Sequence, residues 1–409
     1  MIPKESGWRH WIAWAAFGAT ASNFASIALA HACLALGIAL LLARPRLARA
    51  PAVMWPALAL IAWTLVAVAF SDEPSSAYPQ VKKLVVFAIL PLTYTAFRTT
   101  GACQRVVQAW FSVAFGACAL ALAQFARAVL HAVATGDDFY RSYVGERITG
   151  FHSHWLTFSH TAVLVMVTLA CYLLFARRRP GFRIWGIVAA LIGAALVLSF
   201  TRSAWLALLA SGLYLLAVAK PRLLAVGPIV LAIAYLVAPN AIQQQMESIR
   251  PGANQSRIVM WRTGVNMIKA HPITGVGPER AGPLFPEYKP EDVVELPTGF
   301  YGHLHNVFIH FAAERGIPAA IIVMWLFLQV LVDMRRGLRR TEPGRNDRRF
   351  QLHAGAAATL AIVILSCFDV SLGDSEVLGA YLAIVAVAYR GLPEDREAPE
   401  GSGSASREF

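Results

Sequence analysis

The chain has 409 residues, of which 57% are hydrophobic and only 15% are charged, and its mean hydropathy is +0.53. An ordinary soluble protein carries about 25% charged residues, so this composition excludes that class and indicates a polytopic membrane protein. The net charge of +12 does not indicate nucleic-acid binding, because most basic residues lie in short loops between apolar stretches, where they act as topology signals.

Twelve apolar stretches follow one another along the chain, and their continuous runs lack the alternation of β-barrel strands. A helix needs about 20 apolar residues to cross the hydrocarbon core of a bilayer. The first two stretches form one long run with a weak break at residues 18–23, and we count them as two short helices. The sequence therefore predicts an all-α polytopic fold with about twelve transmembrane helices. The predicted helices cover residues 11–22, 24–43, 52–70, 81–97, 106–130, 155–176, 184–200, 203–219, 223–239, 305–333, 353–370 and 376–390.

The loops between these helices alternate in charge. Arginine and lysine gather in one set, which includes residues 44–49, 177–183, 220–222 and 335–349. The positive-inside rule places this set in the cytoplasm, together with both termini. We therefore predict a multi-pass protein of the bacterial inner membrane, surrounded by membrane lipids, whose other set of loops faces the periplasm.

This topology divides the chain into four parts. Residues 1–239 hold transmembrane helices one to nine, and residues 240–304 form the only long loop, which lies on the periplasmic side. Residues 256–265 of this loop have the spacing of an amphipathic helix lying on the membrane surface. Residues 305–391 hold helices ten to twelve. Residues 392–409 are rich in Glu, Gly and Ser, and this composition predicts a disordered cytoplasmic tail.

Positive charge on the periplasmic side is unusual and marks candidate binding residues. Arg202 lies where two predicted helices meet, and Arg257 lies in the amphipathic segment. Arg147 precedes the sixth helix, and Arg280 follows the glycine-rich turn 271–277. The planar guanidinium can donate two parallel hydrogen bonds to a phosphate, so arginines that meet at the outer leaflet would suit a lipid diphosphate. The alternative is that each arginine extends separately to the lipid headgroups.

A histidine stands at the start of the tenth predicted helix. His305 is followed by Asn306, and a histidine at a helix start faces the positive end of the helix dipole, which favours the neutral imidazole. A neutral imidazole can accept a proton, so His305 is in a form able to act as a general base. His303 forms a His-x-His pair with it, which leaves a metal site open as an alternative. A second group consists of His152, His154 and His160. These histidines could be metal ligands or could form hydrogen bonds at the membrane interface.

Four short motifs lie in the region from about residue 145 to residue 320. One begins at His305-Asn306 and ends ten residues after Asn306, at Gly316. The others are Thr201-Arg-Ser-Ala-Trp205, Ser256-Arg-Ile-Val-Met-Trp261 and His271-Pro-Ile-Thr-Gly-Val-Gly277. Together they resemble the motifs of the O-antigen ligase family, within the ligase and polymerase superfamily of bacterial surface polysaccharides. Residues 145–159 depart from that superfamily's usual pattern, because histidines stand where asparagines are frequent.

The resemblance implies an architecture like that of GT-C glycosyltransferases, and it implies a reaction. A polysaccharide carried on undecaprenyl diphosphate, the donor, is transferred to a sugar hydroxyl of lipid A–core, the acceptor, without metal, ATP or another cofactor. Arg202 and Arg257 would hold the diphosphate, and Arg147 and Arg280 would belong to the same cluster. Around the catalytic base, His305, the supporting residues would be Asn306 and His303. The loops contain no Asp-x-Asp motif of metal-dependent glycosyltransferases, which agrees with this expectation.

Other activities fit the same features. An O-antigen polymerase uses the same donor with a different acceptor, and a protein O-oligosaccharyltransferase transfers the glycan to protein. From another class, a flippase or transporter of lipid-linked oligosaccharides also has about twelve transmembrane helices. A transporter places broken helices and charges near the membrane midplane in both halves, whereas the candidate residues here gather at one face, which favours an enzyme.

Overall fold

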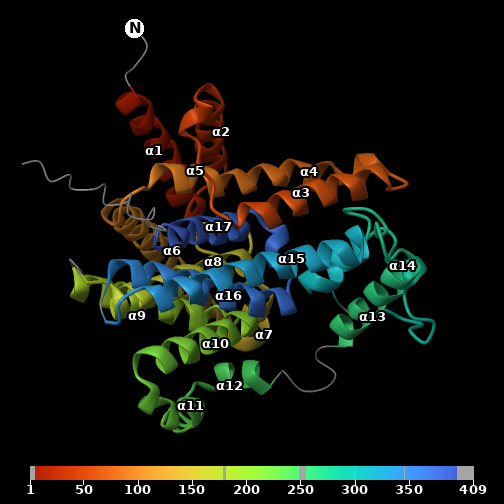
Figure 1. Cartoon of the computed structure of the whole chain (residues 1–409). Helices are drawn as coiled ribbons and strands as arrows, with labels where there is room; N and C mark the ends of the chain where they lie inside the picture. The colour runs from red at the N-terminus through yellow and green to blue at the C-terminus, as the bar shows by residue number, and fades with distance from the viewer. Residues whose placement is uncertain are drawn as a thin grey trace, which may run out of the picture.

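The computed structural model describes residues 5–177, 181–247, 255–297, 299, 301–344 and 346–393. Within these residues all regular secondary structure is helical (Figure 1). The α helices are numbered α1 to α17, and the six short 3-10 helices of the same residues are numbered η1 to η6. The predicted all-α class is therefore confirmed. Of the predicted disordered tail at 392–409, residues 394–409 lie outside the described part of the chain.

In the described part of the chain, five helices are long and apolar enough to cross a membrane by length and composition: α6 (Thr100–Thr135), α8 (Trp155–Phe175), α10 (Arg202–Ala219), α15 (Val307–Arg340) and α16 (Asp347–Phe368). Shorter apolar helices accompany them: α2 (Ile27–Ala43), α3 (Met54–Ala69), α9 (Phe182–Leu198) and α17 (Ser375–Tyr389). These lengths make the chain a helical membrane protein, and the count of twelve spans remains a prediction.

The helix bounds follow the predicted stretches closely in most places. The long N-terminal run does divide, because η1 (Ser22–Phe24) separates α1 (Glu5–Ala21) from α2. Two stretches differ. Residues 81–97 form no single α-helix but pass through α4 (Tyr78–Lys83), η4 (Leu84–Ala88) and α5 (Ile89–Ala96). Pro91 has no N–H to donate to the preceding turn, which accounts for the tighter 3-10 turns before it.

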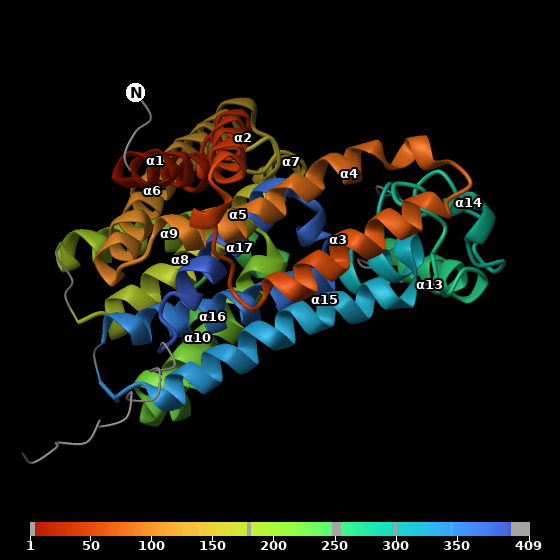
Figure 2. The same ribbon diagram turned by 45° about the horizontal axis from the view of Figure 1, so that its top comes forward.

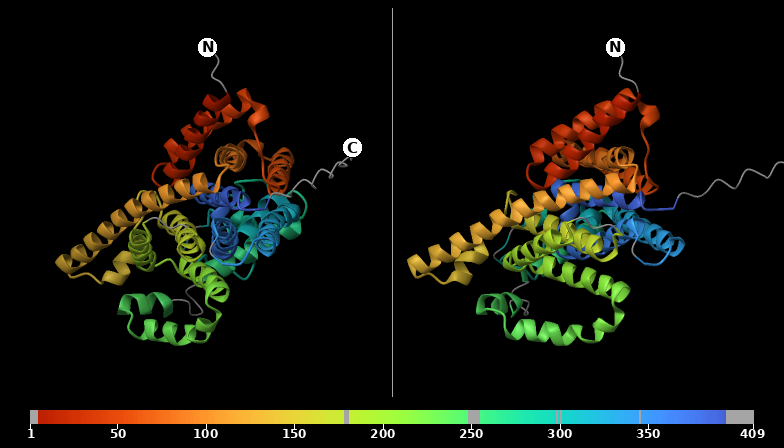
Figure 3. Two further views of the ribbon diagram at one scale, coloured as in Figure 1. Left: turned by 60° about the vertical axis from the view of Figure 1, so that its left-hand side comes forward. Right: turned by 90° about the vertical axis from the view of Figure 1, so that its left-hand side faces the viewer.

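The stretch at 223–239 also divides, into η5 (Pro221–Ala225) and α11 (Gly227–Leu236). A proline follows the first residue of α11, a position where its fixed backbone angle favours a helix start. The helix then has ten residues, about 15 Å in length, which is half of the hydrocarbon thickness. Figure 3 shows α11 and the next helix, α12 (Asn240–Glu247), lying away from the bundle beyond α10.

The centre of the bundle is α16. It packs against α8, α10, α15 and α17, and most of its side chains are buried. Small residues make this close packing possible: a Cβ atom added at Gly355 would lie 2.5 Å from the Cβ of Ala388 in α17. Small residues at such contacts are typical of helices that associate inside a membrane, where backbones must approach closely to gain van der Waals contact.

The predicted long loop contains α12, α13 (Gln255–Ala270) and α14 (Phe285–Tyr288). Figure 2 shows α13 and α14 gathered at one end of α15 and α3, beyond the bundle. A second hydrophobic cluster holds them there, built from buried residues of α13, the following loop and α15, among them Met260, Met267, Leu304 and Ala313. This second core fixes the loop helices to the start of α15, where the candidate residues lie.

Candidate active site

Asn306 starts α15 and ties it to its neighbour. Its side-chain oxygen accepts a hydrogen bond from the backbone N–H of Ile309 (3.0 Å), which is the standard N-cap contact. Its side-chain amide donates to the backbone carbonyl of Cys367 in the last turn of α16 (3.1 Å). The residue therefore positions the start of α15 against the end of α16, and with it the residue before, His305.

His305 has a backbone conformation that few non-glycine residues adopt. Its φ is 47°, in the left-handed region. Its side chain points toward the loop that follows α16, where Nδ1 lies 3.2 Å from Oδ1 of Asp369. Nδ1 of His305 does not form a hydrogen bond of full geometry, so its contact with Asp369 is mainly electrostatic. The unusual backbone angle is the kind of local strain that concentrates at functional sites.

Asp369 was missed by the sequence reasoning. It lies directly after α16, and only 8% of it is exposed. Burial by itself raises the pKa of a carboxyl group, but the contact with His305 and the nearby His160 and His303 hold the pKa of Asp369 below its usual value. Asp369 is therefore ionised at neutral pH. The only available signal was an acidic residue in a loop that the charge pattern had placed on the same side as His305.

His303 stands beside the pair. Its ring lies edge-on to that of His305, with 4.2 Å between the ring centroids. Burial, followed by the charge of His305, lowers the pKa of His303 to about 4, so it is neutral at pH 7. His154, which caps the start of α8 and stacks on Trp155 with centroids 4.0 Å apart, also lies within the electrostatic reach of Asp369 and His305. The site is thus rich in imidazoles around one carboxylate.

Three of the four predicted arginines are within electrostatic reach of one another. Burial lowers the pKa of Arg147, and the charges of Arg202 and Arg257 lower it further. Burial and Arg202 likewise lower the pKa of Arg257, whereas Asp369 raises it. The structure therefore joins this arginine cluster electrostatically to the carboxylate that contacts His305. Three half-buried like charges repel one another, and an anion bound among them would relieve that repulsion.

Arg147 is held firmly in this cluster. Its Nε donates to the backbone carbonyl of Val144 and its Nη1 to that of Phe200, both at 3.2 Å. The guanidinium also lies over the ring of Trp155, 5.4 Å from the centroid. Because Phe200 directly precedes Thr201 and Arg202, these contacts connect the segment before α8 with the start of α10.

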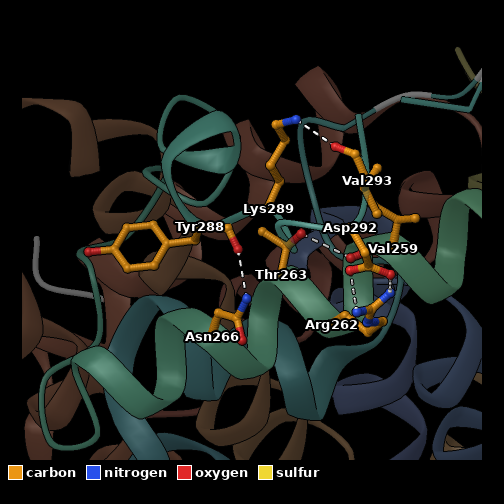
Figure 4. A network of polar contacts seen from close by, with 8 residues as sticks. All are labelled: Val259, Arg262, Thr263, Asn266, Tyr288, Lys289, Asp292 and Val293. Atoms are coloured by element: carbon orange, nitrogen blue, oxygen red, sulfur yellow. Dashed lines mark hydrogen bonds and ion pairs between the residues drawn. The ribbon is translucent and has the colours of Figure 1, made fainter. Parts of the chain in front are cut away.

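Arg257 is supplied by α13, and that helix is tied to the loop after it. In Figure 4, the side chain of Arg262 makes a two-pronged contact with Asp292, at 2.8 and 2.6 Å. One turn further, the Asn266 amide donates to the backbone carbonyl of Tyr288 (3.0 Å). These contacts fix the orientation of the helix that presents Arg257.

A family model described as O-Antigen ligase matches residues 187–324. Residues 187–324 are therefore similar to the O-antigen ligase family. No curated protein matches it. The matched region runs from α9 into the first half of α15, so it contains Arg202, Arg257 and His305, while Arg147 and Asp369 lie outside it. The resemblance seen in the sequence motifs is thus confirmed at the level of the family.

Arg280 also lies within the matched region, but its contacts differ from those of the other three arginines. Its Nη1 is 3.8 Å from Oδ2 of Asp72, in the loop after α3. It follows the turn at residues 271–277, which docks on α15: the N–H of Val276 donates to the carbonyl of Ala313 (2.8 Å). Its surroundings therefore indicate a role in attaching the loop, and no contact in the described residues joins it to the arginine cluster.

The same turn explains the final glycine of the His305 motif. Gly316 has φ 78° and interrupts α15, and a Cβ atom there would lie 1.8 Å from the carbonyl oxygen of Ile273. The break releases backbone groups inside the bundle, and they find partners: Trp63 of α3 donates to the carbonyl of Arg315 (2.7 Å), and the N–H of Ile317 donates to the carbonyl of Pro272 (2.9 Å). Gly316 therefore allows the loop to dock on α15.

One group of side chains in the described residues could hold a metal ion, and it overlaps the catalytic candidates. One ligand atom each from His303, His305 and Asp369 lie within 4.8 Å of one another. Two imidazoles and a carboxylate are suitable ligands for Zn²⁺, with a fourth position left open. The structure thus supplies the further ligand that the His-x-His spacing alone did not name. The other histidine group is used differently, since His154 caps α8 and His152 contacts the hydroxyl of Thr161 (3.4 Å).

Proposed function

We propose that this protein is an O-antigen ligase that transfers a polysaccharide from undecaprenyl diphosphate to a sugar hydroxyl of lipid A–core, on the periplasmic face of the inner membrane. One observation carries the proposal: Asp369, which contacts His305, is also within electrostatic reach of Arg257, and Arg257 is coupled in the same way to Arg147 and Arg202. A base for a hydroxyl and a binding site for a diphosphate are the two elements that this transfer needs.

The pair supplies the base. An ionised Asp369 near Nδ1 favours the tautomer that carries its proton on Nδ1, and it stabilises the imidazolium that forms after proton transfer. Nε2 of His305 is then the acceptor for the proton of the sugar hydroxyl. As that proton leaves, the hydroxyl oxygen forms a bond to the anomeric carbon of the donor glycan.

The arginine cluster acts on the other side of the same carbon. The bond between the anomeric carbon and the phosphate oxygen breaks, and undecaprenyl diphosphate leaves with the electron pair of that bond. Negative charge grows on the leaving oxygen in the transition state, where guanidinium groups already in place stabilise it more than they stabilise the bound donor. The driving force is the departure of a diphosphate, so the transfer needs no nucleotide.

The decisive experiment uses the purified full chain with undecaprenyl-diphosphate glycan and lipid A–core, in the presence of a chelator and without nucleotide. The expected product is glycan attached to lipid A–core. Longer glycan on the lipid diphosphate would identify a polymerase instead, and attachment to a protein acceptor would identify a protein O-oligosaccharyltransferase. Movement of intact donor across a vesicle membrane without transfer would identify a transporter.

The base assignment is tested by His305→Ala. This variant should lose ligation while its thermal unfolding stays close to that of the parent protein. His131→Ala is the matched control, because His131 is an exposed histidine of α6 away from the site. Full activity of the His305 variant would reject the base assignment.

The diphosphate assignment is tested by Arg202→Ala and Arg257→Ala. Each should raise the KM for the donor or lower kcat, and the KM for lipid A–core should change little. Arg141→Ala, in an exposed arginine of α7 (Phe139–Gly145), is the control. If both cluster variants used the donor as well as the control does, the proposed role of the arginines would be wrong.

A further inference from the structure

A second arginine-rich pocket lies far from the His305 site. It has about 720 Å³ of empty space, its mouth included, and forms where α1, the segment after α2 and the connection between α5 and α6 meet. Four arginines line it: Arg9, Arg46, Arg49 and Arg98. The remaining lining residues are small, apolar or hydroxyl-bearing: Ile12, Leu47, Thr95, Ala96, Thr99 and Ala102.

The charge of this pocket is one-sided. No Asp or Glu lines it, and the four arginines make no ion pair with any residue in the described part of the chain. A fifth cation lies close by, since burial lowers the pKa of Arg390 and the charges of Arg98 and Arg49 lower it further. The positive end of the long α6 dipole also begins here, at Thr100. Converging positive charge of this kind favours a bound anion.

The pocket is held together by specific contacts and is more than a group of loop arginines. The backbone N–H of Arg49 donates to the hydroxyl of Thr95 (2.9 Å), and that hydroxyl donates to the carbonyl of Arg49 (3.1 Å). Arg390 donates from Nε to the carbonyl of Tyr94 (2.7 Å) and lies over its ring. Topology alone requires basic residues on one side of the membrane, but it does not require that they converge on one cavity.

The position of the pocket separates it from the His305 site. The pocket lies at the start of α6, where the Gln104 amide donates to the Asp347 carboxylate at the start of α16 (2.7 Å). From there α16 runs 22 residues, about 33 Å, before it reaches Asp369. That distance matches the hydrocarbon thickness of a bilayer. The two arginine groups therefore lie at opposite ends of the transmembrane helices.

We propose that this pocket binds the headgroup of an anionic phospholipid, with a lipid that carries two phosphates, of the cardiolipin type, as the best match for four guanidinium groups. Each phosphate can accept paired hydrogen bonds from arginine, and the apolar wall formed by the partly exposed Leu47 and Ala102 can contact the first carbons of the acyl chains. A soluble phosphate would use the charged wall and leave the apolar one without a partner.

The test measures lipid binding to the purified full chain in detergent, by native mass spectrometry and by the shift in Tm on lipid addition. Three ligands are compared: cardiolipin, zwitterionic phosphatidylethanolamine and soluble inorganic diphosphate. Cardiolipin should remain bound and raise Tm, and the other two should do neither. Diphosphate that binds as tightly as cardiolipin would overturn the assignment to a lipid, and equal binding of phosphatidylethanolamine would overturn the role of charge.

Two variants localise the binding. Arg46→Gln combined with Arg98→Gln should weaken cardiolipin binding about tenfold or more, because each arginine near an anionic headgroup contributes on the order of 1 kcal/mol. Arg105→Gln is the matched control, since Arg105 is an exposed arginine of the same α6 end that does not line the pocket. Equal loss of binding in the control would show that general positive charge, and not this pocket, attracts the lipid. Both variants change only exposed side chains, so both proteins should fold normally. The Tm measured without lipid checks this, because a destabilised variant would show a lower value.

Discussion

The role of Asp369 rests on its charge and on its place beside His305. Its carboxylate is buried, ionised and 3.2 Å from the imidazole, and it also contributes to the potential at Arg257. A neutral group of the same shape would keep the packing but lose both effects. It would also offer an amide N–H to Nδ1, which favours the wrong tautomer of the histidine. Replacing Asp369 with a neutral group of the same shape therefore distinguishes an electrostatic role of the carboxylate from a steric one.

We predict that Asp369→Asn lowers kcat for ligation by about 100-fold or more and leaves Tm within a few degrees of the parent value. The measurement is single-turnover ligation with purified substrates. Asp374→Asn is the control from the same loop, because Asp374 caps α17 by accepting from the N–H groups of Glu376 and Val377, and asparagine can do the same. Activity of the Asp369 variant equal to that control would remove Asp369 from the mechanism.

His303 gives a prediction about stability and pH. Burial and the charge of His305 lower its pKa from 6.5 to about 4, so the folded state binds a proton less readily than the unfolded chain. The stabilising contribution of neutral His303 is then fully present above about pH 6.5, and it is lost as the pH falls toward 4. We expect the Tm of the parent protein to fall more between pH 7.5 and 4.5 than that of His303→Gln, which cannot titrate. Parallel curves for the two proteins would contradict this account.

At the scale of elements, the motif from His305 to Gly316 contains two residues that shape one helix, α15. Asn306 starts α15 beside the end of α16, and Gly316 interrupts α15 so that the turn at 271–277 can dock. One docked turn therefore connects the loop helices, including the one that carries Arg257, to the helix that begins at His305. The number of residues between Asn306 and Gly316 in the motif therefore sets the length of helix between the contact with α16 and the docked turn.

Gly316→Ala tests this connection. A methyl group there meets the carbonyl of Ile273 at 1.8 Å, in a backbone conformation that alanine disfavours. We expect a loss of several kcal/mol in the free energy of unfolding, together with reduced ligation. Gly136→Ala is the control for backbone strain alone, because Gly136 has a similar φ of 73° and no atom within 4 Å of an added Cβ. It should lose about 1 kcal/mol. Equal losses in both variants would mean that the docked turn contributes nothing.

Most helices could be predicted from hydropathy alone, because burial in lipid or protein demands long apolar runs whatever their neighbours are. The exceptions are local. Pro91 and Gly227-Pro228 shorten helices within apolar runs of ordinary length, and hydropathy does not register a missing N–H. The length of α6 was also underestimated, since its polar ends continue the helix beyond the apolar part.

At the scale of the whole molecule, the sequence did not predict contacts between residues that lie far apart along the chain. His305 and Asp369 are 64 positions apart, and Arg147 lies further still from Arg257. Motifs identified His305, Arg202 and Arg257 because each motif is local. The partner of His305 and the separation of Arg280 from the other arginines depend on how helices pack, which no local pattern records.

The two arginine groups at opposite ends of the helices lead to a prediction about orientation. Arg335, Arg336, Arg339 and Arg340 end α15, whose other end carries the His305 site, so the positive-inside rule places the site in the periplasm and these four residues in the cytoplasm. In a background with the two partly exposed native cysteines replaced (Cys33→Ala and Cys367→Ala), Glu291→Cys should react with a membrane-impermeant maleimide in cells whose outer membrane is permeabilised.

Arg336→Cys should react only after the inner membrane is opened, because its side chain is exposed but faces the other side. The three remaining cysteines are buried, so the background protein should stay unlabelled and serve as the control. The two positions lie at opposite ends of the same helical bundle, so a single labelling experiment fixes the orientation of both. The reverse pattern would place the His305 site in the cytoplasm, and it would reject the predicted topology together with the periplasmic location of the proposed reaction.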